Sequence, residues 1–416
     1  MNTVTSMEQF IKILNLEDDL VIVQYKRVAR VLIRFMKREN MKDKIKEVLV
    51  VPELKKDKKT MLGIPCSDLT TGEPQDATYL IVKLHDDEHL EALDAVKKFG
   101  ARNVLLIDYE VFASISQSEN PRIDFMCCGF TKCGTTSLSN ALRQNDRIAL
   151  PKGKETFYMH WRNKYGNAPE VFIKKYFNNV DENKLHGNIE PSYHVSARDV
   201  YECFGPDVKI IFMVRQPSLA TYSYFKMLMR RPRAKRYVNF YKKYRKYKLE
   251  IFSQYIEESI YTYGKDRFCY DRWIEQYLDY FPKEQIKVVV FEELIKEPTR
   301  ILDEIQEFIG VKNPITYTEL PFSNEGSAVS RNYISAYINY RYYMAIRSRK
   351  ESLSKDLTFK QRKFFEFAKW AQKYTTVENN EKMTPEQRKG LDDFYRPCVE
   401  NLEKIIGRPL KDVWGM

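Results

Sequence analysis

Ile123–Arg143, with the sequence IDFMCCGFTKCGTTSLSNALR, decides the fold of the larger part of this chain. The apolar run from Ile123 to Cys128 predicts a buried strand, and the residues after Gly134 have the apolar spacing of a helix. Two glycines allow the connecting loop to bend so that successive N–H groups point into one concavity. The positive end of the helix and the charge of Lys132 both stabilise an anion there. The sequence therefore predicts an anion-binding loop suited to phosphate.

This loop differs from the Walker A loop, in which the lysine stands immediately before the hydroxyl residue. Lys132 instead comes three residues before Thr135, in the order G-x-x-K-x-G-T-T. That order resembles the 5′-phosphosulfate loop of the sulfotransferases that use 3′-phosphoadenosine-5′-phosphosulfate (PAPS). The resemblance implies that the nucleotide is bound by Thr131, Lys132, Cys133, Gly134, Thr135 and Thr136. Taken alone, the loop also fits a plain connection between a strand and a helix.

Composition limits the class of protein. At 416 residues, the chain is long enough for one large domain and one small one. No apolar run approaches the ~20 residues of a membrane span, and Met1–Leu20 lacks the compact apolar segment of a secretory signal. Seven cysteines without metal-ligand spacing indicate a reducing compartment rather than a disulfide framework. The formal charge of +12 favours an anionic partner, whether nucleotide, acidic glycan, nucleic acid or membrane surface.

Residues 1–118 are predicted to form a small accessory α/β module with helices near its N-terminus. Strands are expected at Glu47–Val51, Tyr79–Leu84 and Asn103–Asp108, with a helix at Asp86–Phe99 between the last two. This order indicates a Rossmann-like module with a parallel sheet. No G-x-G-x-x-G follows its first strand, so nucleotide binding is not expected in this module.

Before these strands, Val28–Met36 has the apolar spacing of an amphipathic helix. Its basic residues fit a solvated outer face better than a membrane contact. The polar segment Gln117–Pro121 marks the domain boundary, so the second domain is expected at 119–416.

Glu155, in the segment Leu150–Tyr158, is the candidate catalytic base. An acceptor hydroxyl must lose its proton as its oxygen attacks sulfur, and a carboxylate can accept that proton. The sulfotransferases that modify glycans have a glutamate followed by an aromatic pair at this distance after the loop, and their glutamate is the base. A capping glutamate on a basic loop is the structural alternative. The small-molecule members of the family use histidine, which makes His160, His186 and His194 rival bases.

Gly187–Tyr193 resembles the family segment that ends in P-S-Y and lines the acceptor cleft. The family often has a basic or hydroxyl residue where this chain has Ile189 and Glu190. The acceptor is expected to contact Lys154, His160, Tyr193 and His194.

Val208–Val214 predicts a second buried strand, which ends at Arg215, and Ser223 follows eight residues later. In the family, an arginine at this strand end and a serine in the next helix bind the 3′-phosphate of PAPS. A guanidinium can hold a phosphate by two parallel hydrogen bonds, and a serine can donate one more. The alternative is an arginine that forms an ordinary surface ion pair.

Lys226–Lys248 contains eleven Lys or Arg residues among aromatic residues at helical spacing. One face of this tract is expected to pack, whereas the basic face fits an acidic polysaccharide, nucleic acid or solvent.

Three later segments extend the resemblance to about Arg122–Met416. Phe291–Leu294 resembles the family's E-D-L turn, and Tyr395–Trp414 resembles the helix and tryptophan that end many glycan sulfotransferases. Asn324–Ser327, with Arg331, lies where a late loop of the family closes over the nucleotide.

The resemblance thus implies a P-loop-like, three-layer α/β domain around a central parallel sheet. It implies sulfuryl transfer from PAPS to a hydroxyl of a carbohydrate, such as a bacterial surface polysaccharide or glycolipid, with PAP as the product. Lys132 would stabilise charge on the bridging oxygen while Glu155 takes the acceptor proton, and no metal is required. The expected location is the bacterial cytoplasm or the inner face of its membrane.

Three alternatives remain. A small-molecule sulfotransferase would use a histidine base. An ATP-dependent kinase is disfavoured by the lysine position and by the lack of a clear magnesium-binding aspartate after a second strand. A non-catalytic anion-binding or nucleic-acid-binding protein is disfavoured because Lys132, Glu155, Arg215 and Ser223 occur in the family order.

Overall fold

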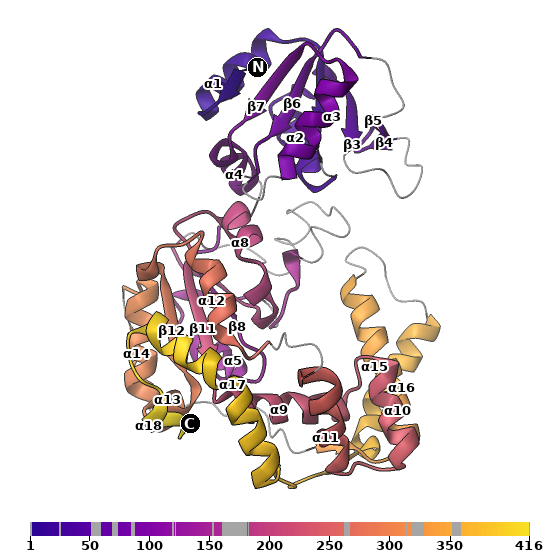
Figure 1. Cartoon of the computed structure of the whole chain (residues 1–416), viewed down its shortest axis with the longest axis vertical. Coiled ribbons are helices and arrows are strands. Elements are labelled where there is room, and N and C mark those ends of the chain that lie inside the picture. The colour runs from indigo at the N-terminus through magenta and orange to yellow at the C-terminus, as the bar shows by residue number, and fades with distance from the viewer. Residues whose placement is uncertain are drawn as a thin grey trace. The chain divides into compact units, whose positions relative to one another are not determined.

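The computed structural model describes residues 2–24, 26–50, 60–68, 74–84, 88–118, 120, 122–151, 154–159, 181, 183–261, 267–312, 314–317, 328–351 and 359–415. The chain divides into two compact units, and Met1–Arg122 belongs to the first of them (Figure 1). Tyr158 and Arg198–Asp207, from later in the sequence, belong to the first unit. Within it, the ring of Tyr201 stacks on that of Tyr109 with centroids 6.2 Å apart. No local pattern in the sequence indicated that these later residues would join the first unit.

The first unit contains a seven-stranded sheet with the order β1-β7-β6-β2-β3-β5-β4. Its strands are β1 (Asn2–Val4), β2 (Leu20–Val23), β3 (Ile45–Val50), β4 (Thr60–Met61), β5 (Ile64–Asp68), β6 (Thr78–Val82) and β7 (Asn103–Ile107). All pairs are parallel except β4 with β5. The expected parallel α/β module is confirmed, but it has more strands than the three predicted. The additional strands have two to five residues each, which is too short for a clear pattern in the sequence.

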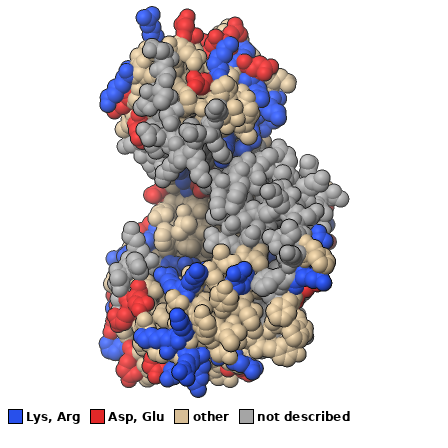
Figure 2. Space-filling view, turned by 90° about the vertical axis from the view of Figure 1, so that its right-hand side faces the viewer, with Lys and Arg blue, Asp and Glu red and all other residues tan. Residues whose placement is uncertain are grey.

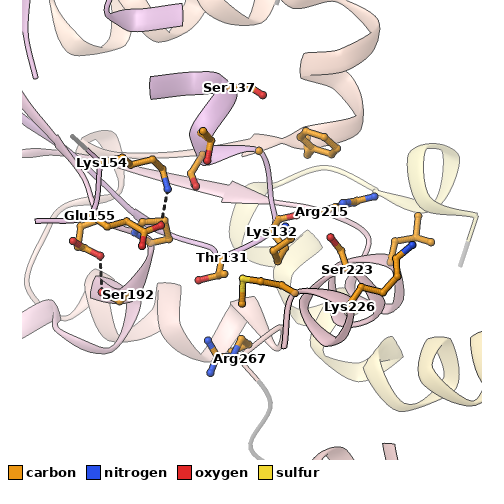
Figure 3. A pocket seen from close by; sticks show the side chains of 18 of the residues that line it. Thr131, Lys132, Ser137, Lys154, Glu155, Ser192, Arg215, Ser223, Lys226 and Arg267 are labelled. Carbon is orange, nitrogen blue, oxygen red and sulfur yellow. Dashed lines mark hydrogen bonds and ion pairs between the residues drawn. The ribbon is translucent and has the colours of Figure 1, made fainter. Parts of the chain in front are cut away.

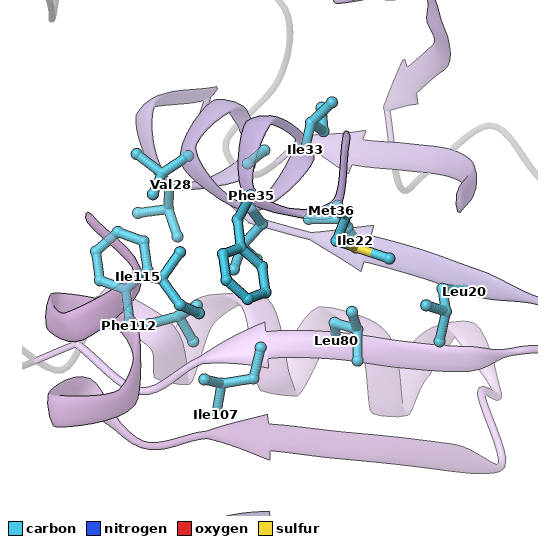
Figure 4. Close-up of a cluster of buried hydrophobic side chains, with 14 of the residues drawn as sticks. Leu20, Ile22, Val28, Ile33, Phe35, Met36, Leu80, Ile107, Phe112 and Ile115 are labelled. Atoms are coloured by element: carbon cyan, nitrogen blue, oxygen red, sulfur yellow. The ribbon is translucent and has the colours of Figure 1, made fainter. Parts of the chain in front are cut away.

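Helices cover both faces of this sheet. They are α1 (Met7–Leu16), α2 (Lys26–Arg38), α3 (Glu88–Phe99) and α4 (Tyr109–Ser118). Leu20 and Ile22 belong to the same buried cluster as Val28 and Phe35 of α2 (Figure 4), whereas Val21 and Val23 belong to a second cluster on the other face. This alternation is the period of two that a strand imposes on its side chains. The apolar face predicted for α2 is therefore confirmed as core; the expected helix start at Asp86 and Asp87 lies outside the described residues.

The second unit is built on a five-stranded parallel sheet with the order β12-β11-β8-β10-β9. Its strands are β8 (Phe125–Gly129), β9 (Ile148–Ala149), β10 (Leu185–Ile189), β11 (Lys209–Val214) and β12 (Ile286–Val290). The central strand β8 is buried along its whole length, which explains why its sequence is a continuous apolar run rather than an alternating one. This sheet confirms the expected architecture of the domain.

Helices surround the sheet and extend beyond it (Figure 1). α5 (Thr135–Leu142) follows β8, α12 (Tyr270–Leu278) precedes β12, and α13 (Phe291–Lys296) and α14 (Pro298–Ile309) follow β12. α17 (Pro385–Ile406) packs against α9 (Pro217–Arg230) and α12, and α18 (Lys411–Trp414) comes after it. α8 (Ala197–Phe204) falls almost wholly in the first unit. α9 leads to a helical group of α10 (Lys235–Tyr244), α11 (Glu250–Tyr255), α15 (Tyr333–Glu351) and α16 (Phe359–Thr375). The short strands β13 (Ala328–Ser330) and β14 (Thr376–Glu378) pair antiparallel beside this group.

The predicted packing face of the basic tract is confirmed. Tyr237, Phe240 and Tyr241 of α10 are buried, and the hydroxyl of Tyr241 donates to the carbonyl oxygen of Met229 at 3.0 Å.

The cysteines depart from the expectation in one respect. Cys269, next to the start of α12, and Cys398, in α17, form a disulfide. The two residues are 129 positions apart, so no local spacing predicts the pair. The other five cysteines are buried and form no disulfide. None of the helices described above combines the length and the apolar composition that crossing a bilayer requires.

Candidate active site

The predicted anion-binding loop lies between a strand and a helix, in the order that the sequence predicted. Gly134 caps the N-terminus of α5 with a φ of 87°, a conformation that side chains other than glycine rarely adopt. A Cβ atom at this position would lie 2.3 Å from Cδ2 of Phe291. Glycine is therefore required here twice, by the backbone conformation and by the close approach of the phenylalanine ring. The first N–H groups of α5 remain available to an anion, because they have no partner within the helix.

A cavity of about 620 Å³ opens at the carboxyl ends of four neighbouring strands (Figure 3). The residues that follow β8, β10, β11 and β12 all contribute to its lining. The predicted residues that line it are Thr131, Lys132, Gly134, Thr135, Thr136, Lys154, Glu155, Arg215 and Ser223. This is the edge at which open parallel sheets bind their ligands.

Lys132 lies in the loop with a φ of 73° and is largely enclosed. Burial lowers the pKa of its ammonium group to about 8, and the positive charges of Arg230 and Arg215 contribute in the same direction. Three cations converge on a space that has too little negative charge to balance them. An anionic ligand would relieve this repulsion.

Arg215 follows β11 directly and turns its guanidinium toward the same space. The guanidinium carbon lies 5.0 Å from the centre of the Phe291 ring, and one Nη donates to the carbonyl oxygen of Lys132 at 3.4 Å. Its Nε is buried and has no hydrogen-bond partner among the described residues. A buried donor without a partner is costly, so the site is built to receive an acceptor atom.

The turn that carries Arg215 forms hydrogen bonds with two segments that the family resemblance identified, one containing Glu292 and one containing Trp414. The N–H of Gln216 donates to Glu292 at 3.1 Å, and its side-chain amide donates to the carbonyl oxygen of Trp414 at 2.8 Å. The indole N–H of Trp414 also donates to Glu292, at 3.0 Å. The glutamate of the E-E-L turn and the C-terminal tryptophan thus hold the turn that carries Arg215 in place.

One face of α9 extends the basic lining. Lys226, Met227 and Arg230 line the cavity three, four and seven residues after Ser223, which places all four on one side of the helix. The Nε of Arg230 is buried without a hydrogen-bond partner in the described part of the chain. Part of the basic tract is therefore a wall of the cavity rather than a solvated face.

Glu155 lies on the opposite side of the cavity from Ser223 and Lys226 (Figure 3). Its carboxylate forms an ion pair with Lys154 at 2.9 Å, and its φ is 65°. The two residues that follow Glu155 are both hydrogen-bonded to the end of β10. The side-chain amide of Asn188 donates to the hydroxyl of Thr156 at 3.3 Å, and the N–H of Phe157 donates to Glu190 at 2.8 Å.

Glu190 is a second carboxylate beside Glu155, and its side chain is fully buried. Burial, with a contribution from the charge of Glu155, raises the pKa of Glu190 to about 7. Its other oxygen accepts from the hydroxyl of Ser192 at 2.7 Å. The residue that departs from the family pattern therefore holds the loop that carries the candidate base.

Several predicted residues lie away from the cavity. His194 is buried between Phe130 and Trp273, and burial lowers its pKa to about 4, with Arg267 contributing. Tyr193 is buried too, and its carbonyl oxygen accepts from Tyr277. His186 is buried in β10, with its Nε2 3.0 Å from the carbonyl oxygen of Asp181. These three residues are parts of the core, contrary to the expected acceptor contacts of Tyr193 and His194.

Two predicted nucleotide ligands also differ from expectation. Arg331 is exposed, outside the cavity lining, and its N–H donates to Thr375 at 2.9 Å. The sulfur of Cys133 points into the core and lies 3.4 Å from the hydroxyl of Tyr270. His160 and Asn324–Ser327 lie outside the described residues.

Glu190, Pro191 and Ser192 also line the cavity, and they belong to Gly187–Tyr193, the segment that resembles the acceptor-cleft segment of the family. The remaining lining residues were not predicted from the sequence: Phe157, Ser137, Leu219, Tyr222, Lys226, Met227, Arg230, Arg233, Arg267 and Phe291. The helical spacing from Ser223 could have identified Lys226 and Arg230. Nothing in the local sequence marks Arg267.

Comparisons with known proteins identify a family for this chain. A family model described as a sulfotransferase domain matches residues 122–406. A sulfotransferase from Alicyclobacillus acidocaldarius is similar in structure, with 20% identity over 71% of this chain and 100% of that chain and a TM-score of 0.45. A mouse sulfotransferase complexed with PAP has 14% identity over 70% of this chain and 90% of that chain, with a TM-score of 0.34. The search of curated proteins finds no match to the chain.

Proposed function

Because the chain belongs to the sulfotransferase domain family, we propose that its sulfuryl donor is PAPS and that its acceptor is a hydroxyl of a carbohydrate. The transfer of sulfuryl groups follows from the family itself. The donor, the acceptor class and the residue roles are argued from the cavity.

The basic side of the cavity fits a nucleotide with phosphate groups at both ends of its ribose. The loop 131–136 and the start of α5 would bind the 5′-phosphosulfate through backbone N–H groups and the threonine hydroxyls. Arg215 and Ser223 would bind the 3′-phosphate, and the unpartnered Nε of Arg215 supplies a donor for it. PAPS brings a sulfuryl group on an anionic leaving group. Lys132 would stabilise the negative charge that develops on that leaving group.

Glu155 supports the choice of a glycan-type acceptor. Among the described residues that line the cavity, no histidine is present, and Glu155 is the partly exposed carboxylate on the side away from the nucleotide residues. It can accept the proton of an acceptor hydroxyl, while Lys154 holds its carboxylate in place. This placement is the observation that carries the proposal. The biological acceptor would be a surface polysaccharide or a glycolipid.

Nucleotide binding provides the test of the donor. ADP is an isomer of PAP that lacks the 3′-phosphate, so it is a matched control. PAP at ~100 times its dissociation constant should raise the free energy of unfolding by about 2.7 kcal/mol. ADP at the same concentration should stabilise the protein much less. Equal stabilisation by the two nucleotides would remove the role given to Arg215 and Ser223.

A further inference from the structure

α16 exposes four large aromatic side chains along one face. Phe359, Phe367, Trp370 and Tyr374 are 71%, 53%, 59% and 60% exposed, and their spacing of eight, three and four residues places them on one side of the helix. The last three form a row, with ring centres 6.0 Å and 5.2 Å apart. Ala371 and Thr375 are buried beside this face, so α16 also packs against the protein. These four side chains are called the aromatic face of α16.

The neighbouring helix α15 adds further exposed apolar side chains. Ile334 is 67% exposed, and Tyr333, Tyr337 and Met344 are also exposed. Soluble proteins seldom leave so many large apolar groups in contact with water, and such surfaces usually bind another protein, a membrane or a ligand. Figure 2 faces the side on which Figure 1 draws these helices, and it shows an uncharged area of the second unit beside Lys and Arg side chains.

The charge around the aromatic face is strongly positive. Residues 331–375 contain eleven Lys or Arg and three Asp or Glu. Arg362 and Lys363 are exposed on α16 itself, and the ammonium group of Lys363 lies 4.8 Å from the centre of the Phe359 ring. Aromatic rings beside basic side chains match a membrane surface, where rings insert at the level of the headgroups and cations meet anionic lipid.

We propose that the aromatic face of α16 docks this enzyme on an anionic lipid membrane. A second copy of the chain is a poorer occupant, because two identical basic surfaces would repel one another. A sugar chain is poorer as well: Phe359, Phe367, Ile334 and Met344 offer it no hydrogen bond, whereas lipid chains need none.

Hydrogen bonds and a ring contact connect the docking surface to the wall of the active-site cavity. Ser330, which precedes α15, donates its hydroxyl to the carbonyl oxygen of Arg230 at 3.1 Å. Asn339 of α15 donates to Ser330 at 3.0 Å and accepts from Thr375 at the end of α16. The guanidinium of Arg233, a cavity residue, lies 5.5 Å from the centre of the Tyr343 ring in α15. A membrane bound by α16 would therefore be held at a fixed place relative to the cavity, as an acceptor carried by a lipid requires.

Vesicle sedimentation with the full chain tests this inference without any nucleotide. Vesicles of phosphatidylcholine with about 30% phosphatidylglycerol should bind the protein, and pure phosphatidylcholine vesicles should bind it at least about tenfold more weakly. The double variant Phe367→Ser/Trp370→Ser should lose binding to the anionic vesicles by at least about tenfold. Leu16→Ser is the matched control, because Leu16 is 73% exposed but lies in the first unit; it should bind like the wild type.

PAP binding by the double variant provides the second readout. An unchanged PAP affinity shows that the variant is folded, and it separates this proposal from that of the donor. The inference is overturned if the wild type ignores anionic vesicles or if the double variant binds them as well as the wild type does. It is also overturned if the wild type is a dimer that this variant dissociates, since the face would then join two copies.

Discussion

Replacing Gly134 with alanine tests whether the ring of Phe291 links the predicted anion-binding loop, residues 131–136, to Arg215. The added methyl group would stand 2.3 Å from Cδ2 and 2.7 Å from Cε2 of Phe291, so the ring must move. The same ring lies 5.0 Å from the guanidinium carbon of Arg215. We therefore expect the substitution to displace the arginine as well as to distort the loop.

The size of the effect follows from two separate terms. A residue other than glycine at a φ of 87° costs roughly 1–2 kcal/mol, which lowers the free energy of unfolding. Displacing Arg215 removes a charge-assisted contact to the 3′-phosphate, at a cost of roughly 1.5–3 kcal/mol in PAP binding. The second term corresponds to a rise in the dissociation constant of roughly 10- to 150-fold.

Calorimetric titration with PAP, together with thermal unfolding, separates the two terms. Gly310→Ala is the matched control, because Gly310 has a φ of 82° and its added Cβ would meet no atom within 4 Å. Both variants should lose stability, but only Gly134→Ala should lose affinity for PAP. Wild-type affinity in Gly134→Ala would refute the link through Phe291.

Two further predictions concern pH. The pKa of Lys132 is about 8 in the free protein, so above that pH the lysine must take up a proton to bind an anion, and the affinity for PAP should fall about tenfold per pH unit. The variant Lys132→Arg keeps its charge, so calorimetric titration should show no such fall. A fall as steep as in the wild type would exclude Lys132 as its source. Glu190 keeps its proton up to about pH 7 in the folded protein but releases it near 4.5 when unfolded, so its contribution lowers stability as pH rises between these values. Urea unfolding of Glu190→Gln should therefore show a free energy of unfolding that is higher by up to roughly 3 kcal/mol at pH 8 and nearly unchanged at pH 4.5. An equal change at the two pH values would contradict a raised pKa of the buried Glu190 carboxyl.

The elements that the sequence predicted correctly have strong local signals. β8 and β11 are long apolar runs because both faces of a parallel sheet are covered. The amphipathic spacing of α2 likewise identified a packed helix. β2 and β9, with four and two residues, are too short for a period to show, and their pairing depends on tertiary contacts.

Part of the site could also be predicted, because some of its residues have strong local signals in the sequence. Gly134, Lys132 and Arg215 each stand beside an element end, where sequence spacing fixes position. The neighbourhood of Glu155 and Glu190 arises because their loops follow different strands of one sheet, and no spacing of 35 residues implies it. His186 and His194, two of the three rival bases, are core residues, because burial depends on the fold and not on residue type.

Transfer of labelled sulfate from PAPS to a panel of glycans, by the wild type and by Glu155→Gln, tests the central claim most directly. Glutamine has nearly the same shape as glutamate but cannot accept the acceptor's proton, so PAPS affinity should hold while turnover falls by ~100- to 10,000-fold. Near-normal turnover in Glu155→Gln would contradict the assignment of Glu155 as the base. If His160→Ala also abolished activity, the base would be His160, and the acceptor would be a small hydroxylated molecule rather than a glycan.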